Sequence, residues 1–414
     1  MNGAIGGASA DRSSILTDTT APLARNALGT TTFAIIAAVS FCHMLNDVLQ
    51  SMLSAIYPML KDSYGLDFWQ IGLLTLTFQV TASLLQPVIG LVIDKRPMPY
   101  SLPLGMASSL AGLLLLAVAH SYPMLLVGAA LIGIGSAIFH PESSRVARTA
   151  SGGRYGMAQS FFQVGGNFGQ AIGPLLAAFI IVPRGQGSIA WFALAALVGI
   201  FVLWRVGRWY EQKRRAAVAR GPVSAAMPLS RQRTTAILIV LMLLTFTKNI
   251  YTAAFSSYYT FFTMERFGLS IESAQIMLFL FLGAFALGTV LGGPIGDRIG
   301  TKAVIWFSIL GALPFSLALP YVDLFWTGML SVIIGLIMAS SFPAILVMAQ
   351  ELVPGRVGMV AGIFFGFAFG MGGIAAAVLG VIADARGIEY VYWLCSFLPL
   401  MGLLAIFLPN LKHR

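Results

Sequence analysis

Charged side chains are scarce in this chain of 414 residues: Asp, Glu, Lys and Arg together make up 10% of it. A soluble domain carries about 25% of these residues. Hydrophobic residues reach 58%, and the mean hydropathy is +0.85. Most of the chain must therefore face lipid or other membrane helices, which indicates a protein that crosses the bilayer many times.

The chain also has few of the residues that disulfides, metal sites and phosphate sites need. Its two cysteines, Cys42 and Cys395, both fall inside apolar runs, which predicts buried thiols rather than a disulfide. The four histidines are scattered at positions 43, 120, 140 and 413, and neither a nucleophile elbow nor a Gly-x-x-x-x-Gly-Lys-[Ser/Thr] phosphate loop occurs. We therefore expect no metal, no cofactor, no enzymatic activity and no ATP-driven pump.

Long apolar runs are abundant instead. About twelve of them are long enough to cross roughly 30 Å of hydrocarbon as a helix. They lie near 33–58, 68–92, 100–119, 122–144, 156–182, 188–206, 234–263, 272–296, 302–320, 323–348, 358–383 and 388–408. The short alternating segments of a barrel strand are missing, so we predict an all-α membrane protein with about twelve transmembrane helices.

The net charge of +10 is explained by the positions of the basic residues. Lys and Arg gather in alternate loops, and their largest cluster surrounds the only long hydrophilic interior segment, 207–233. By the positive-inside rule, this distribution places both termini and the 207–233 segment in the cytoplasm. Because topology accounts for the cluster, we expect no nucleic-acid partner.

The same hydrophilic segment divides the chain into two sets of six spans. The predicted parts are a cytoplasmic tail at 1–30, an N-terminal six-helix bundle at 31–206, a cytoplasmic central loop at 207–233, a C-terminal six-helix bundle at 234–409 and a cytoplasmic tail at 410–414. With an even number of spans in each half, the halves are parallel repeats related by an axis along the membrane normal.

Two pairs of similar segments, about 200 residues apart, indicate that the halves arose by duplication. Gly90–Arg96 corresponds to Gly293–Lys302, and Gly153–Met157 corresponds to Gly355–Met359. A duplicated helical bundle with a binding site between its halves is a common design of secondary transporters.

The segment Gly293–Lys302 resembles the loop signature of the major facilitator superfamily, which lies between the second and third spans of a half. The resemblance implies that fold and a loop that governs opening at the cytoplasmic face. The candidate gating residues are Asp94, Lys95, Asp297, Arg298 and Lys302. An Asp at a helix end can meet the N-terminus of a neighbouring helix. The first copy departs from the signature at 97–99, and a turn that only anchors the chain by its charges is the alternative.

The first span carries polar side chains on one helix face. His43, Asn46, Asp47, Gln50, Ser54 and Tyr57 recur at intervals of three and four residues. A charged carboxylate near mid-membrane costs about 2.5–3.5 kcal/mol, so Asp47 must face a cavity or a partner. We predict that Asp47 and His43 couple protons and that Asn46, Gln50 and Tyr57 are available to substrate. An ion pair that only locks helices together is the alternative.

The seventh span repeats this arrangement with the opposite charge. Lys248 could attract an anionic substrate as a compact point charge, and Tyr251 and Tyr258 add aromatic surface beside it. A Lys248 held in a permanent ion pair is the alternative.

Further candidates lie on the second, fourth and fifth spans. The amides of Gln79, Gln163 and Asn167 can bind substrate oxygens, but amides at such spacings also bond helices to one another. His140 and Glu142, near the end of the fourth span, are candidate proton-transfer residues, with ordinary interface chemistry as the alternative. The Arg usual just upstream of Gly133–Ala137 in the superfamily's proton relay is missing, which gives more weight to His43, Asp47 and Glu142.

Gly169, Gly173 and Pro174 in the fifth span resemble the superfamily's antiporter motif, which implies close helix packing and favours export. Longer strings at 139–148, 163–169 and 350–356 resemble a drug-exporting branch of the superfamily. This resemblance implies an inner-membrane transporter that exports fosmidomycin or a related anionic phosphonate in exchange for protons, by alternating access, and we expect a monomer. Proton-coupled uptake of an organic anion and, in a different class, a channel are the alternatives.

Overall fold

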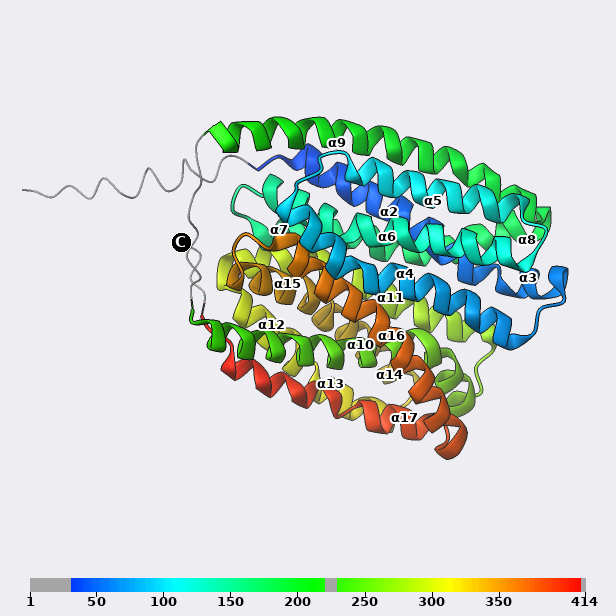
Figure 1. The fold of residues 1–414 in the computed structure, drawn as a ribbon. Helices are drawn as coiled ribbons and strands as arrows, with labels where there is room; N and C mark the ends of the chain where they lie inside the picture. The colour runs from blue at the N-terminus through cyan, green and yellow to red at the C-terminus, as the bar shows by residue number, and fades with distance from the viewer. Residues whose placement is uncertain (1–30, 220–228, 411–414) are drawn as a thin grey trace, which may run out of the picture.

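The computed structural model describes residues 31–219 and 229–410 as a bundle of long helices (Figure 1). No strand occurs among these residues. The predicted tail at 1–30, residues 411–414 of the predicted tail at 410–414, and the middle of the predicted central loop, 220–228, lie outside the described residues.

The first half of the described chain holds ten helical elements. They are α2 (Phe33–Ala55), α3 (Tyr57–Tyr64), α4 (Phe68–Lys95), α5 (Ser101–Val118), α6 (Tyr122–Ala150), α7 (Tyr155–Leu176), the π-helical turn η1 (Ala177–Ile181), α8 (Val182–Arg184), η2 (Gln186–Phe192) and α9 (Ala193–Ala219). The second half holds α10 (Arg231–Phe267), α11 (Ile271–Ile299), α12 (Thr301–Leu310), α13 (Leu313–Ala318), η3 (Leu319–Tyr321), α14 (Leu324–Met338), α15 (Ser341–Leu352), α16 (Val357–Arg386), α17 (Ile388–Cys395) and η4 (Leu398–Phe407).

Every predicted span coincides with a helix or a short series of helices. Eleven helical stretches in the described part of the chain are long and apolar enough to cross a membrane. The predicted span near 156–182 corresponds to α7, η1 and α8, and α7 carries four amide side chains: Gln159, Gln163, Asn167 and Gln170. One of these amides, Gln170, donates a hydrogen bond to Asp47.

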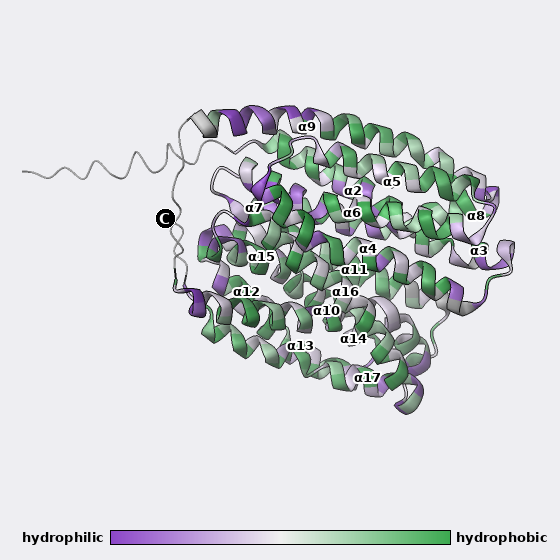
Figure 2. Ribbon diagram, in the orientation of Figure 1, coloured by the Kyte–Doolittle hydropathy of each residue, from purple (hydrophilic) through white to green (hydrophobic). Residues whose placement is uncertain are grey.

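Helix α9 continues to Ala219, well past the predicted end of its span at 206. The added turns are rich in Arg, Lys and Ala, which favour helix, and Glu211 pairs with Arg215 one turn later at 2.5 Å. Part of the predicted central loop is therefore helical. Figure 2 shows that hydrophilic residues gather on these last turns of α9 and at the start of α10, whereas the middle parts of the long helices are mostly hydrophobic.

The two halves of the chain lie side by side, with α4, α7, α11 and α16 between them (Figure 1). Contacts between the halves are made chiefly by α4 with α16 and by α7 with α11. Glycines allow these close approaches: a Cβ atom on Gly90 would lie 2.8 Å from the backbone nitrogen of Met359. Cys42 and Cys395 are both buried and free, which confirms the prediction of unpaired thiols.

Candidate functional site

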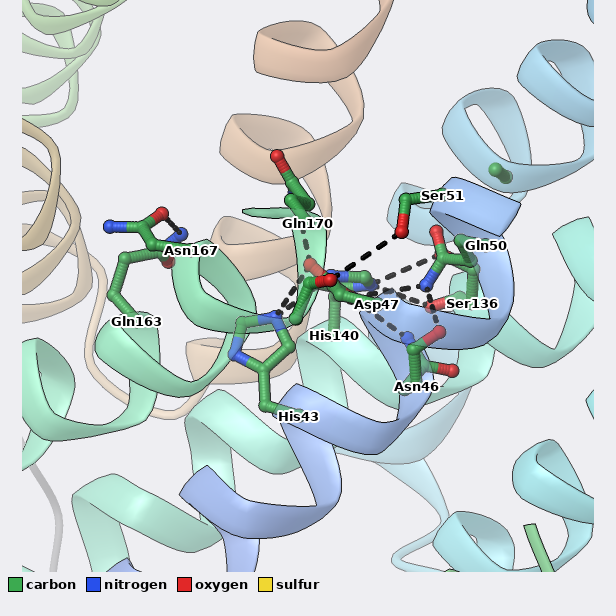
Figure 3. A network of polar contacts seen from close by, with 12 residues as sticks. His43, Asn46, Asp47, Gln50, Ser51, Ser136, His140, Gln163, Asn167 and Gln170 are labelled. Atoms are coloured by element: carbon green, nitrogen blue, oxygen red, sulfur yellow. Dashed lines mark hydrogen bonds and ion pairs between the residues drawn. The ribbon is translucent and has the colours of Figure 1, made fainter. Parts of the chain in front are cut away.

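A buried polar cluster forms where α2, α6 and α7 meet (Figure 3). His43 and Asp47, one turn apart on α2, point toward His140 of α6. Each of the three side chains is at most 3% exposed. The sequence placed His43 and Asp47 on one helix face, and the fold brings His140 to the same point from about 100 residues away.

The carboxylate of Asp47 is almost fully satisfied by neutral donors. Its Oδ1 accepts hydrogen bonds from the amides of Asn46 and Gln50, both at 3.1 Å, and its Oδ2 accepts one from Gln170 at 3.0 Å. The nearest nitrogen of His43 and that of His140 each lie 3.6 Å from a carboxylate oxygen. Such a shell offsets the cost of burying a negative charge.

Both imidazoles are held at the ring nitrogen that faces away from the cluster. Nδ1 of His43 lies 2.7 Å from the carbonyl oxygen of Phe162, and Nδ1 of His140 lies 2.9 Å from that of Ser136. Gly166 of α7 makes room for His43 and Asp47, since a Cβ atom there would lie 2.5 Å from Nε2 of His43 and 3.0 Å from Oδ2 of Asp47.

His43, Asp47 and His140 also have the chemistry of metal ligands, and their ligand atoms lie within 4.8 Å of one another. However, Asp47 already accepts three amide hydrogen bonds, so little of its acceptor capacity is left for a cation. A proton, which needs only one free lone pair, fits this donor set better. The absence of a resident metal or cofactor stays a prediction.

Aromatic rings of both halves cover the cluster. The rings of Phe365 and Phe369, both on α16, have their centroids 5.2 and 5.0 Å from that of His140. The ring of Phe162 stacks on His43 from α7 at 4.2 Å. The cluster therefore belongs to the first half but is closed off by a helix of the second half.

Lys248 is the counterpart of this cluster on α10, and it is 9% exposed. Its Nζ lies over the faces of Phe285 and Phe342, 5.1 and 5.6 Å from the ring centroids. No acidic side chain of the described residues forms an ion pair with it. The alternative of a permanent ion pair is therefore not found in the described part of the chain, where the charged end of Lys248 instead contacts two aromatic faces.

The other candidate substrate residues lie in different surroundings. Gln50 bridges Asp47 to Ser136, whose hydroxyl donates to the Gln50 amide oxygen at 2.9 Å, and Asn46 is fully buried beside it. Gln163 contacts Asn167 at 3.5 Å, and Asn167 reaches across to Thr289 of the second half at 3.3 Å. Gln79 lies on α4 opposite Gly373 of α16.

The three candidate tyrosines already have hydrogen-bond partners. Tyr251 is buried in the aromatic core of the second half, where it accepts from Ser316 at 2.8 Å. Tyr258 donates to the carbonyl oxygen of Ala376 at 2.6 Å, and Tyr57 on α3 accepts from Thr75 at 3.2 Å. Their predicted contact with substrate stays a prediction.

Asp94 and Asp297 occupy equivalent positions at one end of the boundary between the halves. Asp94, at the end of α4, accepts hydrogen bonds from the backbone nitrogens of Gly358 and Met359 at 2.9 and 2.7 Å. Asp297, at the end of α11, accepts from those of Gly156 and Met157 at 2.8 and 2.9 Å. Each carboxylate thus meets the first turn of a helix in the opposite half, and we call these two contacts the latches.

The remaining gating candidates lie outside the latches. Lys95 and Arg298 are exposed, and Lys302 donates to the carbonyl oxygen of Ile406 at 3.0 Å. They surround the latch end of the molecule with positive charge.

A third group of polar residues lies at this end, and the sequence analysis did not predict that its members contact one another. Arg145 pairs with Glu142 at 3.1 Å and with Asp94 at 3.5 Å, and it donates to the carbonyl oxygen of Ile93 at 2.9 Å. Glu142 is 1% exposed. The spacing of Glu142 and Arg145, three residues apart on one helix, was the signal that could have indicated the pair.

The predicted antiporter-motif residues lie on α7 where it packs against α2. A Cβ atom on Gly169 would lie 3.0 Å from that of Asp47, and one on Gly173 would lie 3.0 Å from that of Ser51. Pro174 follows within the same helix. The glycines therefore bring α7 close enough for Gln170 to reach Asp47.

The sequence matches the Major Facilitator Superfamily over residues 39–377 and 237–414. It is 59% identical over 384 residues to the fosmidomycin resistance protein of Escherichia coli (strain K12), covering 93% of this chain and 95% of that protein. It is 41% identical over 397 residues to the uncharacterized MFS-type transporter YfnC of Bacillus subtilis (strain 168), covering 92% and 94%.

Solved structures show the same fold at low sequence identity. The human organic anion transporter MFSD10 (TETRAN) superimposes with a TM-score of 0.70 at 20% identity, covering 90% of this chain and 99% of that chain. The E. coli fucose:proton symporter FucP gives a TM-score of 0.68 at 17% identity, covering 91% and 98%. The chain therefore belongs to the major facilitator superfamily of multi-pass membrane transporters.

Proposed function

We propose that this member of the major facilitator superfamily exports fosmidomycin or a related anionic phosphonate in exchange for protons. The observation that carries the proposal is the division of charge between the halves. The first half holds the buried cluster of His43, Asp47 and His140, and the second half holds Lys248 without an acidic partner among the described residues. The first half therefore has groups that can bind a proton, and the second half has a charge that can bind an anion.

Two observations support an anionic phosphonate as the substrate: the positive charge of Lys248 and the similarity to the fosmidomycin resistance protein of E. coli. A phosphonate is negatively charged at neutral pH, and Lys248 offers a charge that no described carboxylate already neutralises. Asn249, the next residue of α10, has a buried amide nitrogen that finds no hydrogen-bond partner among the described residues. The relative with 59% identity is named for resistance to fosmidomycin, which supports a phosphonate drug and outward transport.

The latches support alternating access. Both join the halves at the same end, so breaking them together would open a path between the halves at that end. By the positive-inside rule, this end of the molecule and both termini face the cytoplasm. The membrane in this proposal is the bacterial inner membrane. The transporter would work as a monomer, since each half supplies one of the two charged sites.

The electrostatics of the cluster favour one alternative, proton-coupled uptake of an organic anion. An unprotonated cluster carries the charge of Asp47 and repels an anion, whereas a bound proton removes that repulsion. If electrostatics alone decided, the protein would therefore bind the proton and the anion at the same time, as a co-transporter does. Export by exchange requires that the two ligands favour different conformations, because only a difference in affinity between states can drive the change.

The direction of proton movement separates the two functions. Purified protein is reconstituted into proteoliposomes with a pH-sensitive dye inside, and fosmidomycin is added outside without an imposed gradient. Exchange moves protons out of the vesicles as the drug enters, so the lumen becomes alkaline. Co-transport moves protons inward and acidifies the lumen. A lumen pH that does not respond to the drug, in vesicles that do take it up, would refute proton coupling.

A further inference from the structure

The two histidines of the cluster approach each other through the same ring atom. Nε2 of His43 lies 3.2 Å from Nε2 of His140, which is within hydrogen-bonding distance. The rings are nearly perpendicular, at 84°, with centroids 5.0 Å apart. The two nitrogens thus meet edge to edge rather than by ring stacking.

The other nitrogen of each ring determines what this contact must be. Nδ1 of His43 and Nδ1 of His140 both face backbone carbonyl oxygens, at 2.7 and 2.9 Å. A carbonyl oxygen only accepts, and the Ser136 hydroxyl, 3.3 Å from Nδ1 of His140, donates its hydrogen to Gln50, so each Nδ1 must carry a hydrogen. If both rings were neutral, each Nε2 would then present a lone pair to the other at 3.2 Å, with no hydrogen between them. One added proton turns this repulsion into an N–H···N hydrogen bond.

We propose that His43 and His140 hold a single shared proton between their Nε2 atoms, and that this pair, not Asp47, is the proton carrier of the transport cycle. The inference rests on the proposed proton coupling and names its carrier. Loading forms one Nε2–H bond with a proton taken from hydronium, which leaves water. Unloading breaks that bond and returns the proton to water.

The charge balance supports one proton rather than none or two. Asp47 accepts three amide hydrogen bonds, which suits the ionised carboxylate because that form only accepts. An ionised Asp47 and a singly protonated histidine pair sum to zero charge. A neutral cluster avoids the cost of an uncompensated charge in the interior of a membrane protein.

No other titratable group of the described residues faces the pair. Around it, α7 presents Phe162, Gly166 and Gln170, and α16 presents Phe365 and Phe369. Glu142 is on the same helix as His140 but is paired with Arg145 toward the latches. With α16 packed over His140, the proton is enclosed, so loading or release requires α16 to move relative to the first half.

Nitrogen NMR on isotope-labelled histidine tests the pair directly. Full-length protein in nanodiscs should show a scalar coupling between two Nε2 atoms, which arises only across an N–H···N bond. His43→Gln and His140→Gln should each abolish the coupling, whereas His120→Gln, a change at an exposed histidine, should preserve it. Two unprotonated Nε2 signals throughout the pH range in which wild-type protein transports would overturn the proposal.

Transport assays separate this inference from the proposed function. His43→Gln and His140→Gln should lose drug-driven proton movement but keep drug binding, because Lys248 is untouched. Proton movement that persists in both variants would overturn the shared-proton carrier while leaving exchange intact. If wild-type protein binds fosmidomycin without moving protons, the proposed function fails, and the NMR coupling still decides whether the pair holds a proton.

Discussion

The surroundings of Asp47 lead to a prediction for its neutral analogue. We expect Asp47→Asn to abolish proton-driven transport while the protein still folds and reaches the membrane. Without the carboxylate, a proton on the histidine pair would leave an uncompensated positive charge in the buried cluster, so the pair would not be loaded. Drug-driven proton movement in proteoliposomes, at matched protein content, measures the effect.

The matched control for this change is Asp62→Asn, because Asp62 is an exposed carboxylate on α3. It should transport like wild type. Full proton-coupled transport by Asp47→Asn would assign Asp47 a purely structural role in joining α2 to α7 through Gln170.

Lys248 has a separate prediction, because its charge serves the drug rather than the proton. Lys248→Met keeps the length and apolar contacts of the side chain with Phe285 and Phe342 but removes the charge. Losing a charge-assisted hydrogen bond costs about 1.5–3 kcal/mol, so the Kd for fosmidomycin should rise roughly 10- to 100-fold. Equilibrium binding to purified protein measures this, with the exposed Lys213→Met as control. An unchanged Kd would remove Lys248 from the drug site.

At the residue scale, spacing along a helix predicts which polar side chains share a face, but not which side chains of other helices they contact. His43 and Asp47 follow from helical spacing on one span. Their contact with His140 depends on how α2 and α6 pack, and spacing within a helix carries no information about that. The same limit applies to Tyr251, because its spacing on α10 does not show that it packs in the aromatic core of the second half.

At the scale of helices, the latches predict a shift between conformations. An anionic side chain at a helix N-terminus contributes about 0.3–1 kcal/mol, and up to about 2 kcal/mol when partly buried. Asp94→Asn and Asp297→Asn should each favour the state that is open at the latch end, by about 2- to 30-fold in the equilibrium constant. Spin labels at Gln212→Cys on α9 and Gln232→Cys on α10, exposed positions in opposite halves, report the change as longer distances.

Glycine variants test the same latches without removing a charge. A Cβ atom on Gly156 would lie 2.8 Å from Oδ1 of Asp297, and one on Gly358 would lie 3.0 Å from Oδ1 of Asp94. Gly156→Ala and Gly358→Ala should therefore open the same end. Gly370→Ala on α16 meets nothing within 4 Å and is the control. Unchanged label distances in all four latch variants would show that the latches do not set the conformation.

The helices themselves were predictable because membrane spans are read from long apolar runs, and every predicted run holds helix. Breaks inside several runs were not predicted. They include the break between α12 and α13 near Gly311, that between α14 and α15 near Ser340, and that between α17 and η4 near Ser396. Both sides of each break are apolar, so hydropathy alone gives no sign of them.

At the scale of the whole molecule, the distribution of Lys and Arg predicts which end faces the cytoplasm. Cysteines introduced at Val218, at the end of α9, and at Asp62, on α3, should be labelled from opposite sides of the membrane in intact cells. The native thiols of Cys42 and Cys395 are buried and should not interfere. Labelling of position 218 by an impermeant reagent added outside would reverse the topology and put the latches at the outer face.

Topology and coupling together determine what the protein does for a cell. If the latch end is cytoplasmic and protons enter as the drug leaves, the proton gradient drives fosmidomycin outward. Cells that make the protein should then accumulate less drug than cells without it, and an uncoupler should abolish the difference. Asp47→Asn, at matched expression, should accumulate as much drug as cells without the protein, because a carrier that cannot load its proton cannot use the gradient. Greater accumulation in cells that make the wild-type protein would contradict export and establish the uptake that the electrostatics of the cluster favour.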